Sequence, residues 1–286
     1  MRATSNRFAT AILLGLVPAV LMVVATPFGR IALIVALVGG CGVAAYAYMS
    51  STSLALRAMH ARRVSELQQP TLCRIVRELS TVARRPMPAV YLSPTAAPTS
   101  FAVGHNQHAA AVCCTMGLLE ALDERQLRAV VAHELTHIYE RDALCGSVSG
   151  ALAAVITGLS GFGYLVSGFD GDHDPEHTPR VVSAALAVLG PIAGTIVRLS
   201  VSRTCEFHAD SAGAILAGDP LALAEALRVL SKRIQAAPLP PDPELVTQAH
   251  LMILPPFRRD EKLLRWFRVH PAASTRIARL EAMVGE

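Results

Sequence analysis

Charged residues are scarce in this sequence of 286 residues. Asp, Glu, Lys and Arg together make up 17% of the chain, and apolar residue types make up 52%. An ordinary soluble domain carries roughly 25% charged residues, so this composition favours a membrane protein. Aromatic residues are also few, at 5%, and the formal net charge of +4 is modest and spread out. We therefore expect no nucleic-acid partner, because a nucleic-acid surface needs clustered Lys and Arg side chains.

The sequence also lacks a cysteine pattern for disulfides or for metal binding. None of its cysteines forms a CxxC pair, and their spacing shows no framework of the kind found in small secreted domains. We interpret them as reduced residues that behave like small apolar side chains. They are Cys41, Cys73, Cys113, Cys114, Cys145 and Cys205.

Two long uncharged runs open the chain, at residues 8–28 and 31–49. Each is long enough to cross a bilayer as a helix. A cleaved signal peptide is the alternative for the first run, but the second run follows at once, which favours a retained transmembrane hairpin within residues 1–56. Arg57 and Arg62 come directly after it. By the positive-inside rule we expect the N-terminus and the segment after the hairpin to be cytoplasmic.

A second pair of uncharged runs lies at residues 143–169 and 181–197, with an acidic loop between them. We expect these runs to form a second apolar hairpin within residues 143–201. Both contain GxxxG pairs, which suit close helix packing in lipid. Because the later run is short, two interpretations stay open. The hairpin either spans the membrane and returns the chain to the cytoplasm, or is buried or only partly inserted.

Residues 57–142 have the composition of a soluble domain, and we expect them to form the first part of a cytoplasmic catalytic domain. Apolar spacing predicts a helix over residues 71–84. Residues 89–92 and 108–115 are candidate strands. Residues 93–104 are rich in Pro, Thr and Ala and are expected to form a loop.

The stretch VAHELTHIYE, at residues 131–140, contains the pattern HExxH. On a helix, His133 and His137 lie one turn apart on the same face, so their two imidazoles can bind one metal ion. Glu134 lies beside them, close enough to act on a metal-bound water. This arrangement indicates a zinc peptidase.

The helix that carries the pattern has a predicted start. Asp123 and Gln126 are spaced as in a capping box, so the helix is expected to begin near Glu124, with Leu127 and Val130 on its buried face. A strand beside this helix would suit a peptidase, because an extended substrate can add to the edge of the sheet and lie across the metal.

A zinc site of this kind needs a third protein ligand and an open fourth position. Residues 202–286, the expected second part of the catalytic domain, begin with SRTCEFHAD. We choose Glu206 as the third ligand, with Arg203 and Asp210 on the same helical face. Asp210 is suited to hold a histidine ligand through its second ring nitrogen.

Several motifs together resemble the HtpX family of membrane-bound zinc metallopeptidases, relatives of the CAAX prenyl proteases: HELTHIYERD, SRTCEFHAD, the late HPAASTRI and the apolar segments between them. PTSFAVG, at residues 98–104, is similar to the family's NAFAxG segment, just ahead of an edge strand. The resemblance implies one zinc ion held by His133, His137 and Glu206, with Glu134 as general base. It implies an α+β fold that is mainly helical, membrane-integrated and zincin-like, with a small β-sheet beside the HExxH helix and two apolar hairpins.

The resemblance also implies a role in the quality control of membrane proteins. The substrates would be damaged or misassembled membrane proteins, or peptides, cut at the cytoplasmic face of the inner membrane, with the lipid bilayer as a further partner. Two departures concern the substrate cleft. Glu140 stands where family members often carry Asn, and Thr99 and Ser100 replace Asn-Ala before Phe101. The sequence does not indicate an oligomeric state.

Two residues are candidates for stabilising the oxyanion of the reaction. His270 belongs to HPAASTRI, and Arg203 precedes the third ligand. The alternative for His270 is that it only precedes a helix that begins at Pro271. Both interpretations of His270 stay open.

Other functions are less well supported by the sequence. A signalling peptidase that cleaves a repressor would carry a sizeable extracytoplasmic sensor, and none is evident. A non-catalytic membrane scaffold would have no use for Glu134 beside an open metal position. An intramembrane site-two protease places HExxH in lipid, which Arg125 and Arg128 would make costly in this helix.

Overall fold

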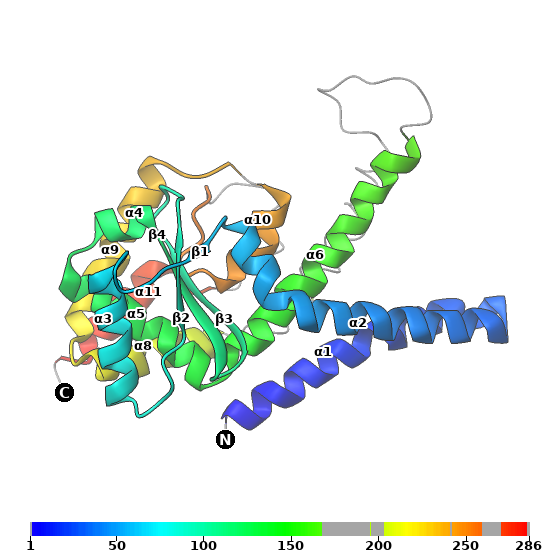
Figure 1. Ribbon diagram of the computed structural model, residues 1–286, viewed down its shortest axis with the longest axis horizontal. Helices are drawn as coiled ribbons and strands as arrows, with labels where there is room; N and C mark the ends of the chain where they lie inside the picture. Colours follow the sequence, from blue (N-terminus) through cyan, green and yellow to red (C-terminus); the bar gives the residue numbers. More distant parts are fainter. Residues whose placement is uncertain (1, 168–194, 196–202, 241, 259–269, 285–286) are drawn as a thin grey trace.

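The computed structural model describes residues 2–167, 195, 203–240, 242–258 and 270–284. Strands and shorter helices gather into a body at one end of the molecule, and long helices extend from it (Figure 1). The long helices are α1 (Arg2–Ala25), α2 (Arg30–Ala58) and α6 (Asp142–Ser167). The fold is mostly helical with a small mixed sheet, as the sequence predicts.

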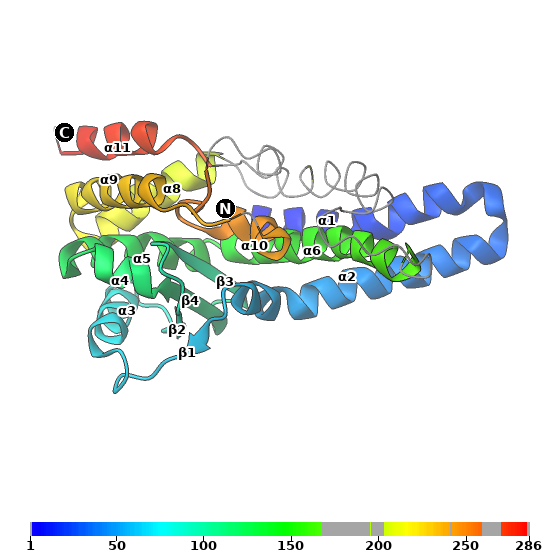
Figure 2. The ribbon, with the colours of Figure 1, turned by 90° about the horizontal axis from the view of Figure 1, so that it is seen from above.

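The two uncharged runs at the start of the chain form the predicted helices. α1 and α2 pack side by side and are joined by the short 3-10 helix η1 (Thr26–Phe28), as Figure 2 shows. Gly40 of α2 allows this close approach, because a Cβ atom there would come within 2.5 Å of Pro18 Cα in α1. Among the described residues, α2 is the one helix long and apolar enough to cross a membrane.

The helix α6 begins the second predicted hairpin. It packs against both α1 and α2, and Leu13 of α1 joins Leu144, Val148 and Leu152 of α6 in a small buried cluster. The acidic loop and nearly all of the later uncharged run lie outside the described residues.

Four strands form one mixed sheet in the order β1-β2-β4-β3. β2 and β4 run parallel, and β3 is antiparallel to β4. The strands predicted from the sequence correspond to β2 and β4, and β3 forms one edge of the sheet. The bounds are β1 (Arg62–Arg63), β2 (Ala89–Ser93), β3 (Ser100–Asn106) and β4 (Ala109–Thr115).

The loop predicted at residues 93–104 is wrong over its last part, because β3 begins at Ser100. Phe101 and Val103 are buried in one core cluster, and Ala102 is buried in another. A strand buried on both faces does not alternate between apolar and polar residues, so its sequence lacks the usual signal. The FAVG segment is therefore itself the edge strand and does not merely precede it.

The helix α5 (Glu124–Tyr139) runs through the centre of the body. It packs against β3 and β4 of the sheet, and also against α8 and α9. Leu127 and Val130 are buried on it, as predicted. The remaining helices are α3 (Pro70–Val82), α4 (Met116–Ala121), α8 (Arg203–Ala217), α9 (Pro220–Ala236), α10 (Pro243–Gln248), the 3-10 helix η3 (Ala249–Leu251) and α11 (Ala273–Ala282).

Candidate metal centre

The HExxH helix is fixed at both ends. At its start, the Asp123 carboxylate accepts a hydrogen bond from the Gln126 backbone N–H at 2.8 Å, and the Gln126 side chain accepts one from the Asp123 N–H at 3.3 Å. The predicted capping box is therefore formed, and the helix begins at Glu124 as expected. At its end the chain turns through Arg141, which has a φ of 63°, and α6 begins at Asp142.

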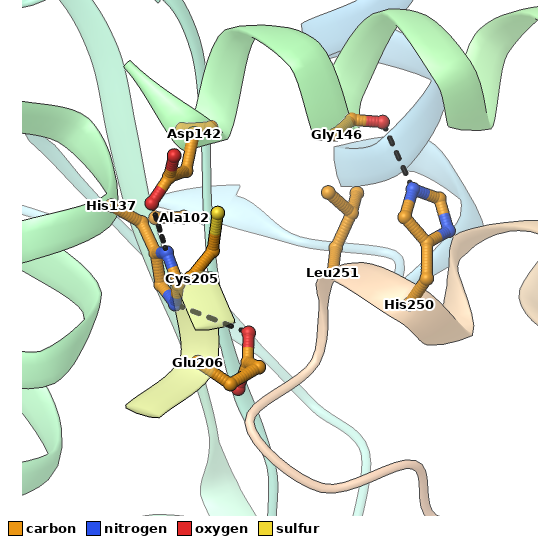
Figure 3. Close-up of a pocket in the computed structure, with 9 residues that line it drawn as sticks. Ala102, His137, Asp142, Gly146, Cys205, Glu206, His250 and Leu251 are labelled. Atoms are coloured by element: carbon orange, nitrogen blue, oxygen red, sulfur yellow. Dashed lines mark hydrogen bonds and ion pairs between the residues drawn. The ribbon is translucent and has the colours of Figure 1, made fainter. Parts of the chain in front are cut away.

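The structure brings the three predicted ligands together. The Nε2 atoms of His133 and His137 are 3.2 Å apart. Glu206, from α8, places Oε1 3.6 Å from His137 Nε2 and Oε2 4.0 Å from His133 Nε2. One ligand atom from each of the three residues lies within 4.8 Å of the others, and Figure 3 shows His137 and Glu206 facing each other.

The close approach of α8 to α5 depends on Gly213. A Cβ atom at this position would come within 2.7 Å of His133 Cα and 2.8 Å of His133 N. Because glycine has no side chain, the two helix backbones can touch. This contact holds the start of α8, and with it Glu206, beside the two histidines.

The donor set fits a catalytic zinc ion. Two imidazole nitrogens and one carboxylate oxygen form one of the ligand sets used by zinc peptidases, which leave a fourth position open. Glu134 is nearly fully buried, and an isolated buried carboxylate is costly without a compensating charge. Glu134 Oε2 is buried and has no hydrogen-bond partner within the described parts of the chain. These residues therefore suit a bound cation.

Each histidine has a carboxylate at its other ring nitrogen. Asp210 Oδ1 lies 3.1 Å from His133 Nδ1, so the role expected for Asp210 is supported by its position. Asp142 Oδ2 lies 3.3 Å from His137 Nδ1. Such contacts fix the tautomer and the orientation of a ligand. Burial lowers the pKa of His137, but the Asp142 hydrogen bond and the Glu206 charge outweigh burial and raise it to about 9.

Arg276, which sequence reasoning missed, binds the centre from α11. Its guanidinium is fully buried and contacts both oxygens of Asp210, at 2.8 and 2.7 Å. It also lies 3.4 Å from Glu206 Oε2 and donates to the Ile253 carbonyl at 2.8 Å. Burial raises the pKa of Asp210, but the positive charge of Arg276 outweighs it and keeps that pKa below its ordinary value.

His270 lies at the centre, next to the third ligand. Its Nδ1 atom is 3.1 Å from Glu206 Oε2, and its Nε2 atom is 2.9 Å from the His250 carbonyl oxygen. Burial raises the pKa of Glu206, but His270 and Arg276 outweigh it and hold that pKa well below its ordinary value. Arg203 is the first residue of α8, and its side chain lies outside the described part of the structure.

The candidate base, Glu134, has a partner that the sequence did not reveal. Ser100, at the start of β3, donates a hydrogen bond from Oγ to Glu134 Oε1 at 2.7 Å, and both residues are buried. Burial raises the pKa of Glu134, partly offset by electrostatic effects of the two histidines and by the Ser100 hydrogen bond.

A small pocket, of about 30 Å³, opens beside the centre. His137 and Glu206 line it together with Ala102 of the edge strand, Cys205 and Leu251 (Figure 3). His250, to which the sequence assigns no role, also lines the pocket. Its ring Nε2 lies 2.9 Å from the Gly146 carbonyl oxygen, and burial lowers its pKa to about 4. We interpret it as a neutral residue that ties η3 to α6.

Comparisons with known proteins show the family to which this chain belongs. Peptidase family M48 matches residues 66–284. A protease HtpX homolog of Kineococcus radiotolerans is 51% identical over 88% of this chain and 86% of its own length. The HtpX homologs of Paenarthrobacter aurescens and Paraburkholderia phytofirmans are 45% and 38% identical, over 100% and 97% of this chain and 99% and 97% of their own lengths. The chain therefore belongs to peptidase family M48 and is a metallopeptidase of the HtpX kind.

Proposed function

We propose that this metallopeptidase is a zinc-dependent endopeptidase whose centre works at the membrane. Glu134 is the observation that carries the proposal. Its carboxyl is buried beside three ligand side chains, one oxygen is held by Ser100, and the other has no hydrogen-bond partner among the described residues. A purely structural metal site has no use for such a base, so this arrangement supports hydrolysis over a scaffold role.

The expected chemistry assigns a separate task to each residue. Zinc, when bound, would lower the pKa of a water molecule and polarise the scissile carbonyl. Glu134 takes a proton from the attacking water and passes it to the leaving amine. Ser100 holds Oε1 of Glu134, so the other carboxylate oxygen is available for this transfer. His270, beside Glu206, and Arg203 are the candidates for stabilising the oxyanion.

The substrate is proposed to approach along the edge strand. Ala102 of β3 lines the pocket beside His137 and Glu206. The start of this edge is already occupied within the chain, because Ile253 N–H donates to the Ser100 carbonyl at 3.0 Å and Met252 pairs with Phe101. Further along, the Gly104 N–H donates to Ser147 Oγ of α6 at 3.4 Å. We therefore place the substrate backbone at Ala102, between these two contacts.

The proposed setting is the cytoplasmic face of the inner membrane, with membrane proteins or peptides as substrates and quality control as the role. The length and apolar composition of α2 support insertion in the bilayer. Arg62 and Arg63, just beyond α2, are exposed and suit the cytoplasmic side. Reporter fusions at Asp172 and Glu286 test the topology. Opposite sides are expected, and a cytoplasmic signal from both would show that the second hairpin does not span.

Two variants test the reaction itself. Glu134→Gln should abolish cleavage of a model membrane substrate while one zinc ion per chain remains bound, because the amide cannot accept the proton. Glu206→Ala should lose the metal as well as activity. Zinc content by elemental analysis and cleavage by gel assay measure the two effects. Cleavage by the Glu134→Gln protein would refute the mechanism, and full zinc content in Glu206→Ala would show that another residue is the third ligand.

A trapping experiment addresses the substrate. The Glu134→Gln protein, expressed in its native membrane, should retain substrates that it cannot cut, and these can be identified after purification. Glu206→Ala is the matched control, because it also lacks activity but should lack the metal that orients the substrate. Membrane proteins enriched only with Glu134→Gln would support the role. Equal recovery with both variants would contradict it.

A further inference from the structure

The N-terminal helix reaches the metal centre through one polar side chain. Asn6 of α1 is half-buried, and its carboxamide Nδ2 donates to the Glu140 carbonyl oxygen at 3.0 Å. The same group donates to Oδ1 of Asp142. Asn6 therefore contacts both sides of the turn through Arg141, where the HExxH helix ends and α6 begins.

The Asp142 carboxylate links this contact to a metal ligand. Its Oδ1 atom accepts from Asn6, and its Oδ2 atom lies 3.3 Å from Nδ1 of His137. With one oxygen on each partner, the carboxylate cannot rotate freely. His137 in turn presents Nε2 to Glu206 at 3.6 Å. Direct contacts therefore connect Asn6 of α1 to Asp142, and Asp142 to the metal ligand His137. The upper part of Figure 3 shows the contact between Asp142 and His137.

The position of Asn6 is set by the packing of α1. Thr10, one turn later, is buried, and Leu13 packs in the apolar cluster of α6 that includes Leu144 and Val148. A shift of α1 along α6 by one turn would be about 5 Å, which is larger than the reach of the Asn6 hydrogen bonds. The contact is therefore made in one register of the two helices only.

We propose that Asn6 is a positioning residue for the metal ligand His137, so that the placement of the N-terminal helix determines how tightly the centre holds its metal. This inference rests on the proposed zinc site. Asn6 acts through Asp142 and touches neither the metal position nor the substrate pocket. Residues that orient a metal ligand typically contribute 10–100-fold in metal affinity. Because Asn6 acts one contact further out, we expect about a tenfold effect.

The test measures zinc affinity of the full-length protein in detergent, by competition with a chromogenic chelator at fixed pH. Asn6→Leu keeps the number and branching of the side-chain heavy atoms and removes the donor, and Asn6→Ala removes the whole carboxamide. Each should bind zinc about tenfold more weakly than the wild type. Thr10→Val is the matched control on the same helix. It removes the hydrogen bond from the Thr10 hydroxyl to the Asn6 backbone carbonyl but keeps the Asn6 carboxamide, so it should bind zinc within about twofold of the wild type.

A double-mutant cycle separates positioning from a general loss of stability. In an Asp142→Ala background, Asn6→Leu should cause no further loss of zinc affinity. The cobalt-substituted protein gives a second readout, because the visible spectrum of Co²⁺ reports the geometry of its ligands, and it should change in Asn6→Leu but not in Thr10→Val. If Asn6→Leu does not fold, the same measurements on Asn6→Ala test the proposal.

Some results would overturn the proposal. One such result is wild-type zinc affinity in both Asn6 variants. The other is that Asn6→Leu lowers zinc affinity equally in the wild-type and the Asp142→Ala backgrounds. These results differ from a failure of the proposed function, in which the wild-type protein itself would bind no stoichiometric zinc or Glu206→Ala would keep it.

Discussion

The hydrogen bond from Ser100 to Glu134 makes a specific prediction about the pH dependence of the reaction. Ser100→Ala removes one hydroxyl from a fully buried position and leaves the strand otherwise unchanged. The bond is 2.7 Å long, and a hydrogen bond to a carboxylate contributes roughly 1.5–3 kcal/mol. It favours the ionised form of Glu134, so its loss should raise the pKa of the base further above its ordinary value.

The base works in its ionised form, so a raised pKa moves the acidic limb of the pH–rate profile to higher pH. At a pH on that limb, a loss of about 1.5 kcal/mol lowers the ionised fraction, and with it kcat/KM, roughly tenfold. The difference should shrink as the pH rises, because both proteins then have an ionised base. A quenched fluorescent peptide, followed across pH in detergent, gives the profiles.

Thr99→Val is the control for this experiment. Thr99 is the neighbour of Ser100 and donates its own buried hydrogen bond to the Leu254 carbonyl at 3.1 Å, away from Glu134. Its loss should lower stability by about 1 kcal/mol and leave the acidic limb unchanged. An unchanged limb in Ser100→Ala, with kcat/KM within about twofold of the wild type, would refute the assigned role of Ser100.

Three further predictions concern stability. Arg276→Leu leaves the buried Asp210 carboxylate without its partner and should cost about 3–5 kcal/mol, measured by thermal unfolding in detergent; a loss below about 1 kcal/mol would contradict it. Arg141→Gly relieves the positive φ of 63° and should stabilise by about 1 kcal/mol in the same assay, whereas a lower unfolding temperature would show that the Arg141 side chain matters more. The hydrogen bond from Arg125 lowers the pKa of Asp219, so this pair stabilises the fold above about pH 4 and loses its effect as the pH falls. Asp219→Asn should therefore lower stability by less than about 1 kcal/mol at neutral pH and not at all in strong acid, and an equal loss at both pH values would argue against a charge effect.

The sequence predicted those parts of the centre whose signals are local. The capping box and the histidine spacing both lie within α5, so its start and its ligand face were readable from the order of residues alone. Glu206 is predicted from the SRTCEFHAD segment and the family resemblance, and Asp210 because it shares a helical face with Glu206. The helical character of the uncharged runs at the start of the chain was equally clear from the absence of charge.

Other parts of the centre depend on contacts that no local pattern encodes. Arg276 looks like an ordinary basic residue on an amphipathic helix until α11 packs beside α8 and buries its guanidinium completely. Ser100 was read as part of a loop, because β3 is covered on both faces and shows no alternation. Asp142 is the last residue of HELTHIYERD, but its contact with Asn6 requires α1 to pack along α6.

The contacts of Arg276 also bear on when the enzyme becomes competent. Its guanidinium neutralises Asp210 and lies beside Glu206, yet it is encoded more than a hundred residues after the HExxH helix. During synthesis, the histidines emerge from the ribosome and their helices can form long before α11 exists. A nascent chain at that stage has Asp210 and Glu206 without the guanidinium that binds them in the complete fold. The centre is therefore completed only by nearly finished chains, and an incompletely synthesised protease should have little ability to cut its neighbours.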